Sequence, residues 1–391
     1  MLLLRFILSP LGLIWGLVAQ IKRWSYECLG LRKKATLPNI VVGNLAVGGS
    51  GKTPMILWLH SQFQKLGVTQ KHIGILSRGY KRKSHGFVWV DPNKSVAAVG
   101  DEPAELFEAL NAENRSKNPH PFDQKIQDDT SESSHPQQAV CEDGWVGIET
   151  MKRESPHLKM VLLDDGYQHL RLNPTLSVVV CDYHKLFTHD WPMPSGRLRE
   201  FPWAAQKAHA VFITNCPESL SDSDLQRKKE ELTQSMVSWL RWKPFTGKDK
   251  TILWENHIGF FSTITSRPES PYHSGTILND EPVMLITGIA NPHRVVEKLS
   301  QYNLVKHLGF PDHHNFDKKS ALKIVAEFEK LRSTYPHLSA LTTRKDWVKL
   351  KSFWPEDLPI FVISSAVKPL SNTELIIQTL LKQFIHENQI A

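Results

Sequence analysis

The stretch "LAVGGSGKTP" (Leu45–Pro54) lies between a short β-branched run, "NIVVGN" (39–44), and a segment with helical periodicity, "PMILWLHSQFQKL" (54–66). From Ala46 to Thr53 it fits the Walker A spacing if alanine is accepted at the first position. Glycines leave no side chain between the backbone and an anion, and they permit the dihedral angles that turn several amides toward it. Strand, loop and helix together predict a phosphate site at the edge of a parallel sheet.

The polar side chains at the end of this loop have distinct expected roles. Lys52 would reach the β- and γ-phosphates of a nucleotide, and Thr53 would ligate Mg²⁺. The alternative is a glycine-rich turn that binds no ligand. The residues expected to bind the nucleotide are Ala46, Val47, Gly48, Gly49, Ser50, Gly51, Lys52 and Thr53.

An acidic pair follows another apolar run, "KMVLLDD" (159–165). If this run is a parallel strand, it delivers Asp164 and Asp165 to the same sheet edge as the glycine-rich loop. One of these carboxylates would then hold the metal or a water molecule bound to it. The alternative is that Asp-Asp-Gly only forms a turn.

Apolar runs of this kind recur along the chain and predict the fold class. Short β-branched runs alternate with helical patterns after residue 39, which is typical of buried parallel strands joined by helices. We expect an α/β protein, namely a P-loop NTPase-like α/β/α sandwich with a second, smaller α/β domain and an N-terminal membrane-associated helix. The expected strands are 39–44, 72–76, 159–165, 176–182 and 209–215, then 251–255, 282–290, 338–346 and 358–364.

The length of the chain indicates more than one domain. At 391 residues it exceeds the size at which a single hydrophobic core usually stops growing. We expect an interfacial helix in 1–30, a P-loop domain in 31–250 and a smaller α/β domain in 251–391. Residues 111–138 have almost no apolar side chains and no period, so we expect a solvent-exposed insertion there without chemistry.

The N-terminal segment is apolar but short for a membrane span. The run from Phe6 to Ile21 has sixteen uncharged residues, about 24 Å as a helix against ~30 Å of hydrocarbon. Ser9 and Pro10 favour a helix that starts there. We expect this helix to lie in the membrane interface, with nearby lysines and arginines on anionic lipid. The alternative is a helix buried in the protein's own core.

Composition excludes several classes of protein. With 41% hydrophobic and 22% charged residues, the chain is neither disordered nor fibrous as a whole. The four cysteines form no CxxC pair, so neither a disulfide framework nor a zinc knuckle is indicated. A net charge of +7 suits a partner that carries phosphate or an anionic membrane surface.

Eight stretches of the chain carry a family resemblance, namely "VVGNLAVGGSGKTP", "ILSRGYKRK", "VGDEPAEL", "LLDDGYQHLRL", "MPSGRLREFPWAA", "ITGIANPHR", "GFPDHHNF" and "LTTRKDWVKL". Together they resemble the tetraacyldisaccharide 4′-kinase family of lipid A biosynthesis, which implies that 31–250 is the kinase domain. The resemblance implies that ATP, with Mg²⁺, phosphorylates the 4′-hydroxyl of an acylated glucosamine disaccharide 1-phosphate to give lipid IVA. It implies two α/β domains with the active site between them, and attachment to the cytoplasmic face of the bacterial inner membrane. We expect no nucleic-acid partner, and a monomer.

The resemblance also assigns a catalytic pair, which acts with Lys52. Asp101 of "GDEP" and His313 of "PDHH" match the family residues thought to activate the sugar hydroxyl. A carboxylate in hydrogen-bond reach can take the hydroxyl proton during attack, while an imidazole orients the hydroxyl. Two alternatives remain open: Asp101 as a helix cap, and a metal site at Asp-His-His.

Three further residues are candidates for contacts with the substrate. Arg199 and Glu200 lie in "SGRLRE", and Arg78 lies in "SRGY". The planar guanidinium of arginine suits phosphate oxygens, although a surface ion pair is the alternative.

Two other functions compete with the kinase. A membrane-partitioning P-loop ATPase would carry a lysine before the paired glycines, where this chain has Val47. A nucleotide-gated membrane adaptor would not need the carboxylate and imidazole at Asp101 and His313.

Overall fold

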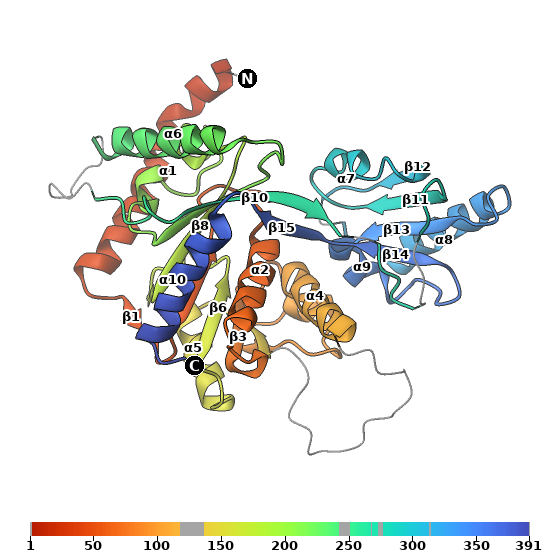
Figure 1. Cartoon of the computed structure of the whole chain (residues 1–391), viewed down its shortest axis with the longest axis horizontal. Coiled ribbons are helices and arrows are strands. Elements are labelled where there is room, and N and C mark those ends of the chain that lie inside the picture. The colour runs from red at the N-terminus through yellow and green to blue at the C-terminus, as the bar shows by residue number, and fades with distance from the viewer. Residues whose placement is uncertain are drawn as a thin grey trace.

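Two sheets organise the chain in this computed structural model, which describes residues 2–117, 137–241, 251–266, 268–272, 277–312 and 314–390. The larger sheet is mixed and the smaller one is parallel, and β10 and β15 run between them in Figure 1. This arrangement confirms the predicted α/β class with a second, smaller α/β unit.

The large sheet has β2 (Asn39–Gly43) at its centre, paired in parallel with β6 (Met160–Asp164) and β8 (Leu176–Asp182). All five residues of β2 are buried, as expected for a strand that is covered on both faces. Among the described residues the strand order is β15-β10-β9-β8-β2-β6-β3-β5-β4, and only β4 and β15 run antiparallel to their neighbours. The other strands are β3 (Ile73–Ser77), β4 (Val88–Trp89), β5 (Gln137–Val140), β9 (Ala210–Thr214), β10 (Ile258–Thr265) and β15 (Ser365–Pro369).

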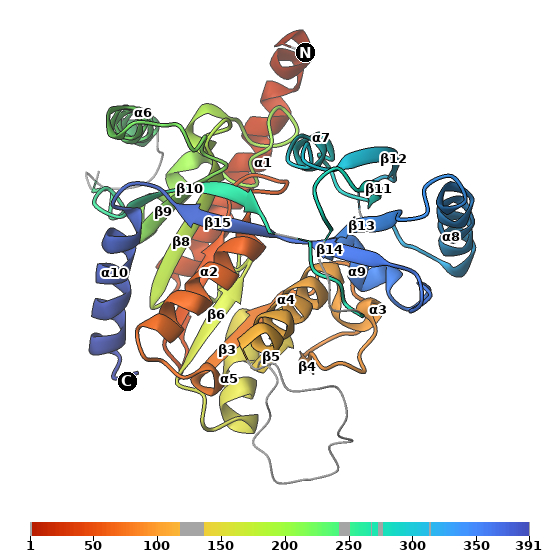
Figure 2. The same ribbon diagram turned by 45° about the vertical axis from the view of Figure 1, so that its right-hand side comes forward.

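Helices pack on both faces of the large sheet because successive strand residues point to opposite sides. Ile40 and Val42 join one core with α2 (Lys52–Lys65), α4 (Asp101–Lys117) and α10 (Thr373–Glu387), which lie in front of the strands in Figure 2. On the other face, Val41 packs near α5, while β8 and β9 pack against α6 and η3. These elements are α5 (Gly144–Glu154), α6 (Asp222–Arg241) and the 3₁₀ helix η3 (Pro202–Ala205).

The small sheet has the strand order β12-β11-β13-β14 and is parallel throughout. Its core contains the buried side chains of Ile286, Ala340 and Phe328. The elements of this unit are β11 (Pro282–Thr287), α7 (His293–Glu297), β12 (Asn303–Gly309), α8 (Lys318–Arg332), β13 (Ser339–Thr343), α9 (Arg344–Leu350) and β14 (Ile360–Ile363). The remaining elements are β1 (Lys33–Lys34), η1 (Gln70–His72), α3 (Val96–Val99), β7 (Leu172–Asn173) and η2 (Phe187–His189).

The sheets divide the chain differently from the expected boundary at residue 250. Strands β10 and β15 and helix α10 all follow that boundary, yet they belong to the large sheet and its core. The expected strand at 251–255 is wrong: its residues form a turn in which Trp254 is fully buried and donates to the Ala205 carbonyl at 2.9 Å. Apolar patterning reports burial, and it does not say which sheet a segment joins or whether a buried segment is extended.

The expected insertion also begins later than predicted. Helix α4 continues through residue 111 and ends at Lys117. Residues 118–136 lie outside the described part of the chain.

The N-terminal helix α1 (Leu2–Cys28) starts before Ser9, so Pro10 lies inside it rather than at its first turn. The inward face of α1 is formed by Gly12, Gly16 and the buried Arg23. A Cβ atom on Gly16 would lie 2.4 Å from the Phe201 ring, which shows how closely the helix backbone approaches the protein. Among the described residues, no helix combines the length and hydropathy needed to cross a bilayer.

Arg23 fixes the end of α1 to the large unit through a buried ion pair. Its guanidinium donates to both carboxylate oxygens of Glu200, at 2.6 and 2.8 Å, and to the Tyr167 carbonyl at 3.4 Å. A bidentate arginine–carboxylate pair is among the stronger and more directional contacts in proteins.

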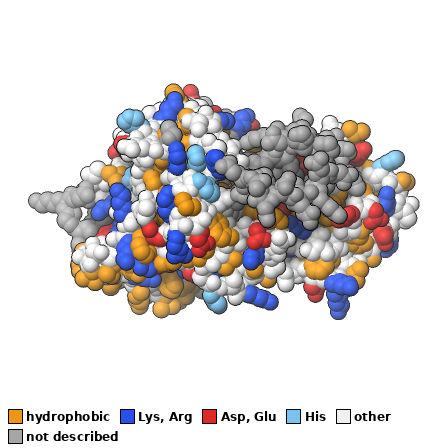
Figure 3. All heavy atoms as spheres, turned by 90° about the horizontal axis from the view of Figure 1, so that it is seen from below, with side chains coloured by type: hydrophobic (Ala, Val, Ile, Leu, Met, Phe, Trp, Pro, Cys, Tyr) orange, Lys and Arg blue, Asp and Glu red, His pale blue; other side chains and the backbone are white. Residues whose placement is uncertain are grey.

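The outward face of α1 is apolar. Figure 3 shows hydrophobic side chains gathered at the lower left of the view from below, the side on which α1 lies in Figure 1. Large apolar patches of this kind mark surfaces that bind a membrane or another protein. The large exposed side chains on the described part of α1 are Ile7, Leu11, Leu13, Ile14, Trp15, Leu17, Val18, Ile21 and Trp24.

Helices α4 and α9 connect the two units. Lys351, at the C-terminus of α9, contacts Glu108 of α4 at 2.9 Å. Burial raises the pKa of Glu105 to about 7, although the charges of Lys345 and Arg344 on α9 oppose the rise. The interface therefore contains a carboxyl group that changes charge near neutral pH.

Replacing Gly16 with valine should loosen the packing of α1, because its Cβ cannot fit beside Phe201 without a shift. We expect a loss of about 1 to 3 kcal/mol in the free energy of unfolding and faster proteolysis within α1. Leu13→Val places a β-branched residue on the outward face of the same helix and controls for helix propensity. Equal losses in both variants would contradict close packing at Gly16.

Glu105→Gln should make the protein less sensitive to pH. The folded-state pKa of Glu105 is about 7 and its ordinary value is 4.5, so between these values the folded state holds a proton that the unfolded state has lost. This contribution to stability is present at low pH and is lost as the pH rises toward 7. The Tm of the variant minus the Tm of wild type should be about 2 °C higher at pH 8 than at pH 5, after allowance for solvent screening. If the change in Tm between pH 5 and pH 8 is the same in the variant and in wild type, the raised pKa of Glu105 is refuted.

Candidate functional site

The glycine-rich loop connects the end of β2 to the start of α2, as predicted. Gly48 has φ 116° and Gly51 has φ 79°, dihedral angles that glycine adopts without strain. Cβ atoms built on Gly48 and Gly49 would meet nothing within 4 Å, so the backbone faces open space there. No side chain caps the N-terminus of α2 at Gly51. The loop therefore offers an accessible helix N-terminus to an anion.

Buried side chains outside the motif hold the loop in this shape. The Asn44 amide donates to Ser50 Oγ at 3.0 Å, and Thr214 Oγ1 at the end of β9 donates to the Ser50 carbonyl at 2.8 Å. Asn44 is 1% exposed and Thr214 is fully buried. Neither residue belongs to a predicted site, although Asn44 ends one predicted strand and Thr214 is the last residue but one of another, which places both at the same sheet edge.

Asp164 ends β6 at this edge and Asp165 follows it, and the two side chains have different environments. Asp164 is 1% exposed, and its Oδ1 has no hydrogen-bond partner among the described residues. Burial raises the pKa of Asp164 to about 7, the charge of Glu102 adds to the rise, and the charge of Lys52 opposes it. Asp164 is therefore a buried acid with one unused oxygen, next to the phosphate loop.

Asp165 is held by two cations. Its Oδ1 lies 3.7 Å from Lys52 Nζ and 3.2 Å from Arg199 Nη1. Asp165 also has φ 49°, an uncommon value for a residue with a side chain, which turns its carboxylate toward the loop lysine. The structure thus brings together the predicted phosphate lysine, the acidic pair and one predicted arginine.

The predicted substrate residues Arg199 and Glu200 are adjacent in sequence but have different partners. Arg199 Nη1 also donates to Gln168 Oε1 at 2.9 Å, and the Arg199 backbone amide donates to the Leu45 carbonyl at 2.7 Å. Both oxygens of Glu200 accept from the buried Arg23. Glu200 therefore anchors α1 in this structure.

Arg78 follows β3 directly and is exposed. Burial lowers the pKa of His169 to about 4, and the charge of Arg78 contributes to the decrease. His169 belongs to the "DDGYQH" stretch, so Arg78 lies near the acidic edge of the sheet.

Asp101 is the first residue of α4. Gly100 precedes it with φ 100°, and a Cβ there would lie 3.1 Å from the Tyr80 carbonyl oxygen. Asp101 Oδ2 lies 3.6 Å from Lys349 Nζ, on α9 of the small unit. The charge of Glu102, the next residue of α4, contributes to the raised pKa of Asp164.

His313 lies outside the described residues, so its predicted role stays a prediction. The residue before it, Asp312, is within 2.8 Å of Lys345 on α9. The chain on that side of His313 is thus tied to the helix that contacts Asp101.

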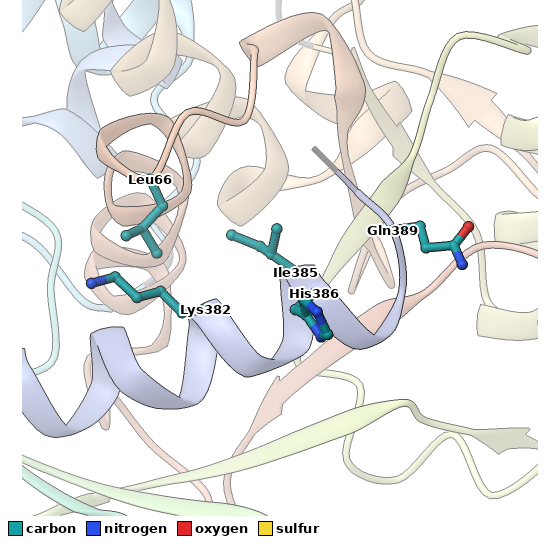
Figure 4. A pocket seen from close by; sticks show the side chains of 5 residues that line it. All are labelled: Leu66, Lys382, Ile385, His386 and Gln389. Carbon is teal, nitrogen blue, oxygen red and sulfur yellow. The ribbon is translucent and has the colours of Figure 1, made fainter.

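A hollow elsewhere on the molecule lies at the opposite end of α2, about 20 Å along the helix from Lys52. Figure 4 shows that its lining side chains come from α10 and from residues just beyond the ends of α2 and α10. The hollow is remote from the phosphate loop. Its lining residues are Leu66, Lys382, Ile385, His386 and Gln389.

The residues present fit a magnesium ion bound together with a nucleotide. Among the described residues no group of three or more His, Cys, Asp or Glu side chains could hold a metal. Mg²⁺ in nucleotide sites commonly takes only one or two protein ligands and completes its shell with phosphate oxygens and water. The unpartnered Oδ1 of Asp164 and the position of Thr53 on the first turn of α2 satisfy that requirement.

Comparison with known proteins gives consistent matches along the chain. A sequence model of the family described as "Tetraacyldisaccharide-1-P 4'-kinase" matches residues 4–119 and 132–384. The unmatched residues 120–131 fall in the predicted insertion. A tetraacyldisaccharide 4′-kinase from Bacteroides thetaiotaomicron is 32% identical over 348 residues, which cover 88% of this chain and 82% of the relative. One from Flavobacterium johnsoniae is 31% identical over 351 residues, which cover 89% and 88%.

A solved structure shares the fold. It is the crystal structure described as "apo" form LpxK from Aquifex aeolicus in complex with ATP, which is 22% identical. It superposes with a TM-score of 0.62 and covers 97% of this chain and 99% of that chain. With the family match over most of its length and relatives that share about a third of its residues, this chain belongs to the tetraacyldisaccharide 4′-kinase family.

Proposed function

We propose that this chain transfers the γ-phosphate of ATP to the 4′-hydroxyl of a tetraacyldisaccharide 1-phosphate and forms lipid IVA. Family membership supports the substrate. The observation that carries the chemistry is that Lys52, Asp164 and Asp165 meet at the carboxyl edge of the sheet, next to the start of α4. This edge is where open α/β sheets bind ligands.

The loop from Ala46 to Thr53 binds the triphosphate. Its open glycine backbone and the N-terminus of α2 stabilise the phosphate charge, and Lys52 contacts the terminal phosphates. Asp165 holds Lys52 in place through the 3.7 Å contact. The geometry thus supports transfer by positioning and electrostatic stabilisation, as is usual for phosphoryl transfer.

Thr53 and Asp164 would hold Mg²⁺. The metal would there supply neutralisation of the charge that develops on the phosphate oxygens. Because the buried Asp164 has its pKa near 7, this carboxyl group must lose a proton before it serves as a ligand. Asp165, which already contacts two cations, positions the lysine and the arginine instead.

Asp101 accepts the proton of the 4′-hydroxyl, and His313 orients that hydroxyl. The support is the position of Asp101 at the start of α4, where its neighbour Glu102 influences Asp164. The acceptor sugar would therefore lie between the large unit and the small unit. Arg199 and Arg78, both at this edge, are candidates for its phosphate contacts.

The two units of the kinase follow the sheets. A P-loop unit comprises the large sheet with α10, and the chain between β10 and β15 forms the acceptor-side unit. The proposed boundaries are therefore near residues 266 and 364 rather than at residue 250.

Helix α1 attaches the enzyme to the cytoplasmic face of the inner membrane, where the lipid substrate lies. Its support is the arrangement of the helix, with glycines toward the protein and large apolar side chains outward. A helix of this kind gains free energy when its outer face is buried among lipid headgroups and acyl chains. The protein's net charge of +7 favours the same surface.

Lys52→Ala should abolish transfer, and Asp101→Asn should slow it by about a hundredfold or more, because one removes a phosphate contact and the other removes the base. The measurement is phosphate transfer from Mg-ATP to the acylated disaccharide 1-phosphate in detergent. Lys65→Ala is the matched control, since this lysine ends the same helix and is 60% exposed. Transfer that persists unchanged in both active-site variants would exclude the proposed chemistry.

Replacing Ile7, Ile14, Val18 and Ile21 together with glutamine should release the protein from vesicles that contain anionic lipid. These side chains are each more than half exposed, so the fold should keep its Tm. Substitution is a sharper test than deletion of the helix, because deletion would also remove Arg23 and leave Glu200 unpaired. The control replaces Leu322 and Leu375, two exposed leucines on α8 and α10, with glutamine. Full sedimentation of the α1 variant with vesicles would show that attachment lies elsewhere.

A further inference from the structure

Lys349 is a buried cation at the contact between the two units. Its side chain is 3% exposed, and its Nζ lies 3.6 Å from Asp101 Oδ2 and 3.7 Å from Asp346 Oδ1. The ring of Phe316 lies 5.7 Å away and covers the ammonium on another side. Lysine is rarely buried this deeply without a charged partner, because removing an ammonium from water costs several kcal/mol.

The two carboxylates beside Lys349 differ in how they are held. Asp346 is fully buried, and its Oδ2 accepts from the Gly288 amide at 2.8 Å and from Thr343 Oγ1 at 2.7 Å. These contacts all lie within the small unit, so Asp346 is held there. Asp101 belongs to α4 of the large unit. Lys349 thus lies between a carboxylate of its own unit and a carboxylate of the other unit.

Nothing in the proposed reaction yet accounts for this lysine. Lys349 donates no hydrogen bond within the described residues, so its distances to both carboxylates leave room for closer approach. A cation beside a general base favours the ionised, proton-accepting form of that base. The same cation restrains where the carboxylate points.

We propose that Lys349 is a positioning residue for the reaction, which orients the Asp101 carboxylate from the opposite unit. This inference rests on the proposed function, because it assigns Asp101 as the base. It makes the active site dependent on the contact between α4 and α9, since the lysine comes from one unit and the base from the other.

Other charges near Asp101 bear on any test by pH. On α4, the helix of Asp101, the neighbouring charged side chains are acidic. Helix α9 carries both acidic and basic side chains. The loop before His313 adds one carboxylate, which is already paired with Lys345. None of these groups is changed in the variants below. They are Glu102, Glu105 and Glu108 on α4, Arg344, Lys345 and Asp346 on α9, and Asp312 in the loop.

The experiment compares Lys349→Met with Lys351→Met. Both lysines face carboxylates of α4 from α9 or its C-terminus, but Lys351 contacts Glu108 at 2.9 Å, two turns of α4 away from Asp101. We expect Lys349→Met to lower kcat about tenfold or more and to move the acidic limb of the kcat/KM profile upward by about one pH unit. The KM for ATP should change little. Lys351→Met should keep the wild-type profile.

Two further variants separate positioning from folding. Lys349→Arg keeps the charge and should restore the wild-type pH profile, with part of the rate. In an Asp101→Asn background, Lys349→Met should have little additional effect on kcat, because the base on which it acts is absent. If Lys349→Met is too unstable to purify, Lys349→Gln removes the charge with less apolar bulk, and the same profile is measured.

The outcomes distinguish this inference from the proposed function. Absence of transfer by the wild-type protein contradicts the proposed function and removes the basis of the inference. Normal wild-type transfer, with a pH profile that does not move in Lys349→Met or Lys349→Gln, overturns the inference alone. A matching shift in Lys351→Met would also overturn it, because the effect would then belong to the interface in general.

Discussion

The site depends on one constraint: a loop that offers its backbone to an anion has few side chains of its own to hold its shape. Gly48 and Gly49 face open space. The loop is instead held by hydrogen bonds that Asn44 and Thr214, at the ends of two different strands, donate to Ser50. Both contacts exist only because β2 and β9 are parallel and end at the same edge. The parallel sheet thus determines the shape of the loop, and it places Asp164 and Asp165 beside that loop for the same reason.

A second chain of contacts connects the N-terminal helix to this edge. Arg23 pairs with Glu200, the neighbouring Arg199 holds Asp165, and Asp165 contacts Lys52. The Trp15 indole also donates to the Arg199 carbonyl at 3.1 Å. The surface that would meet the lipid and the lysine that would meet the nucleotide are therefore joined by a few side chains, each of them wholly or partly buried.

Sequence patterns predicted the parts of this architecture that local chemistry determines. Periodicity correctly predicted the strands before residue 215, and motif spacing correctly predicted the glycine-rich loop and the acidic pair. Each of these features depends on residues close together in the chain. The assignment of β10, β15 and α10 to the large sheet could not be read locally, since it depends on pairing across about a hundred residues. The contacts of Lys349 with Asp101 and of Glu200 with Arg23 are long-range contacts of the same kind. Alternation of apolar residues also could not show that α1 directs its glycines inward, because that pattern is the reverse of an ordinary surface helix.

Strands β10 and β15 have a consequence for how this protein is assembled. They pair antiparallel with Thr265 opposite Ser365, so the chain leaves the large sheet and returns to it at neighbouring positions. In topological terms, the whole small unit occupies the tip of a β-hairpin. An insertion at such a point need not disturb the large unit. Strands β10 and β15 would stay adjacent if a short turn replaced the small unit. The core of the large unit can thus form around α10 whether or not the small unit has folded.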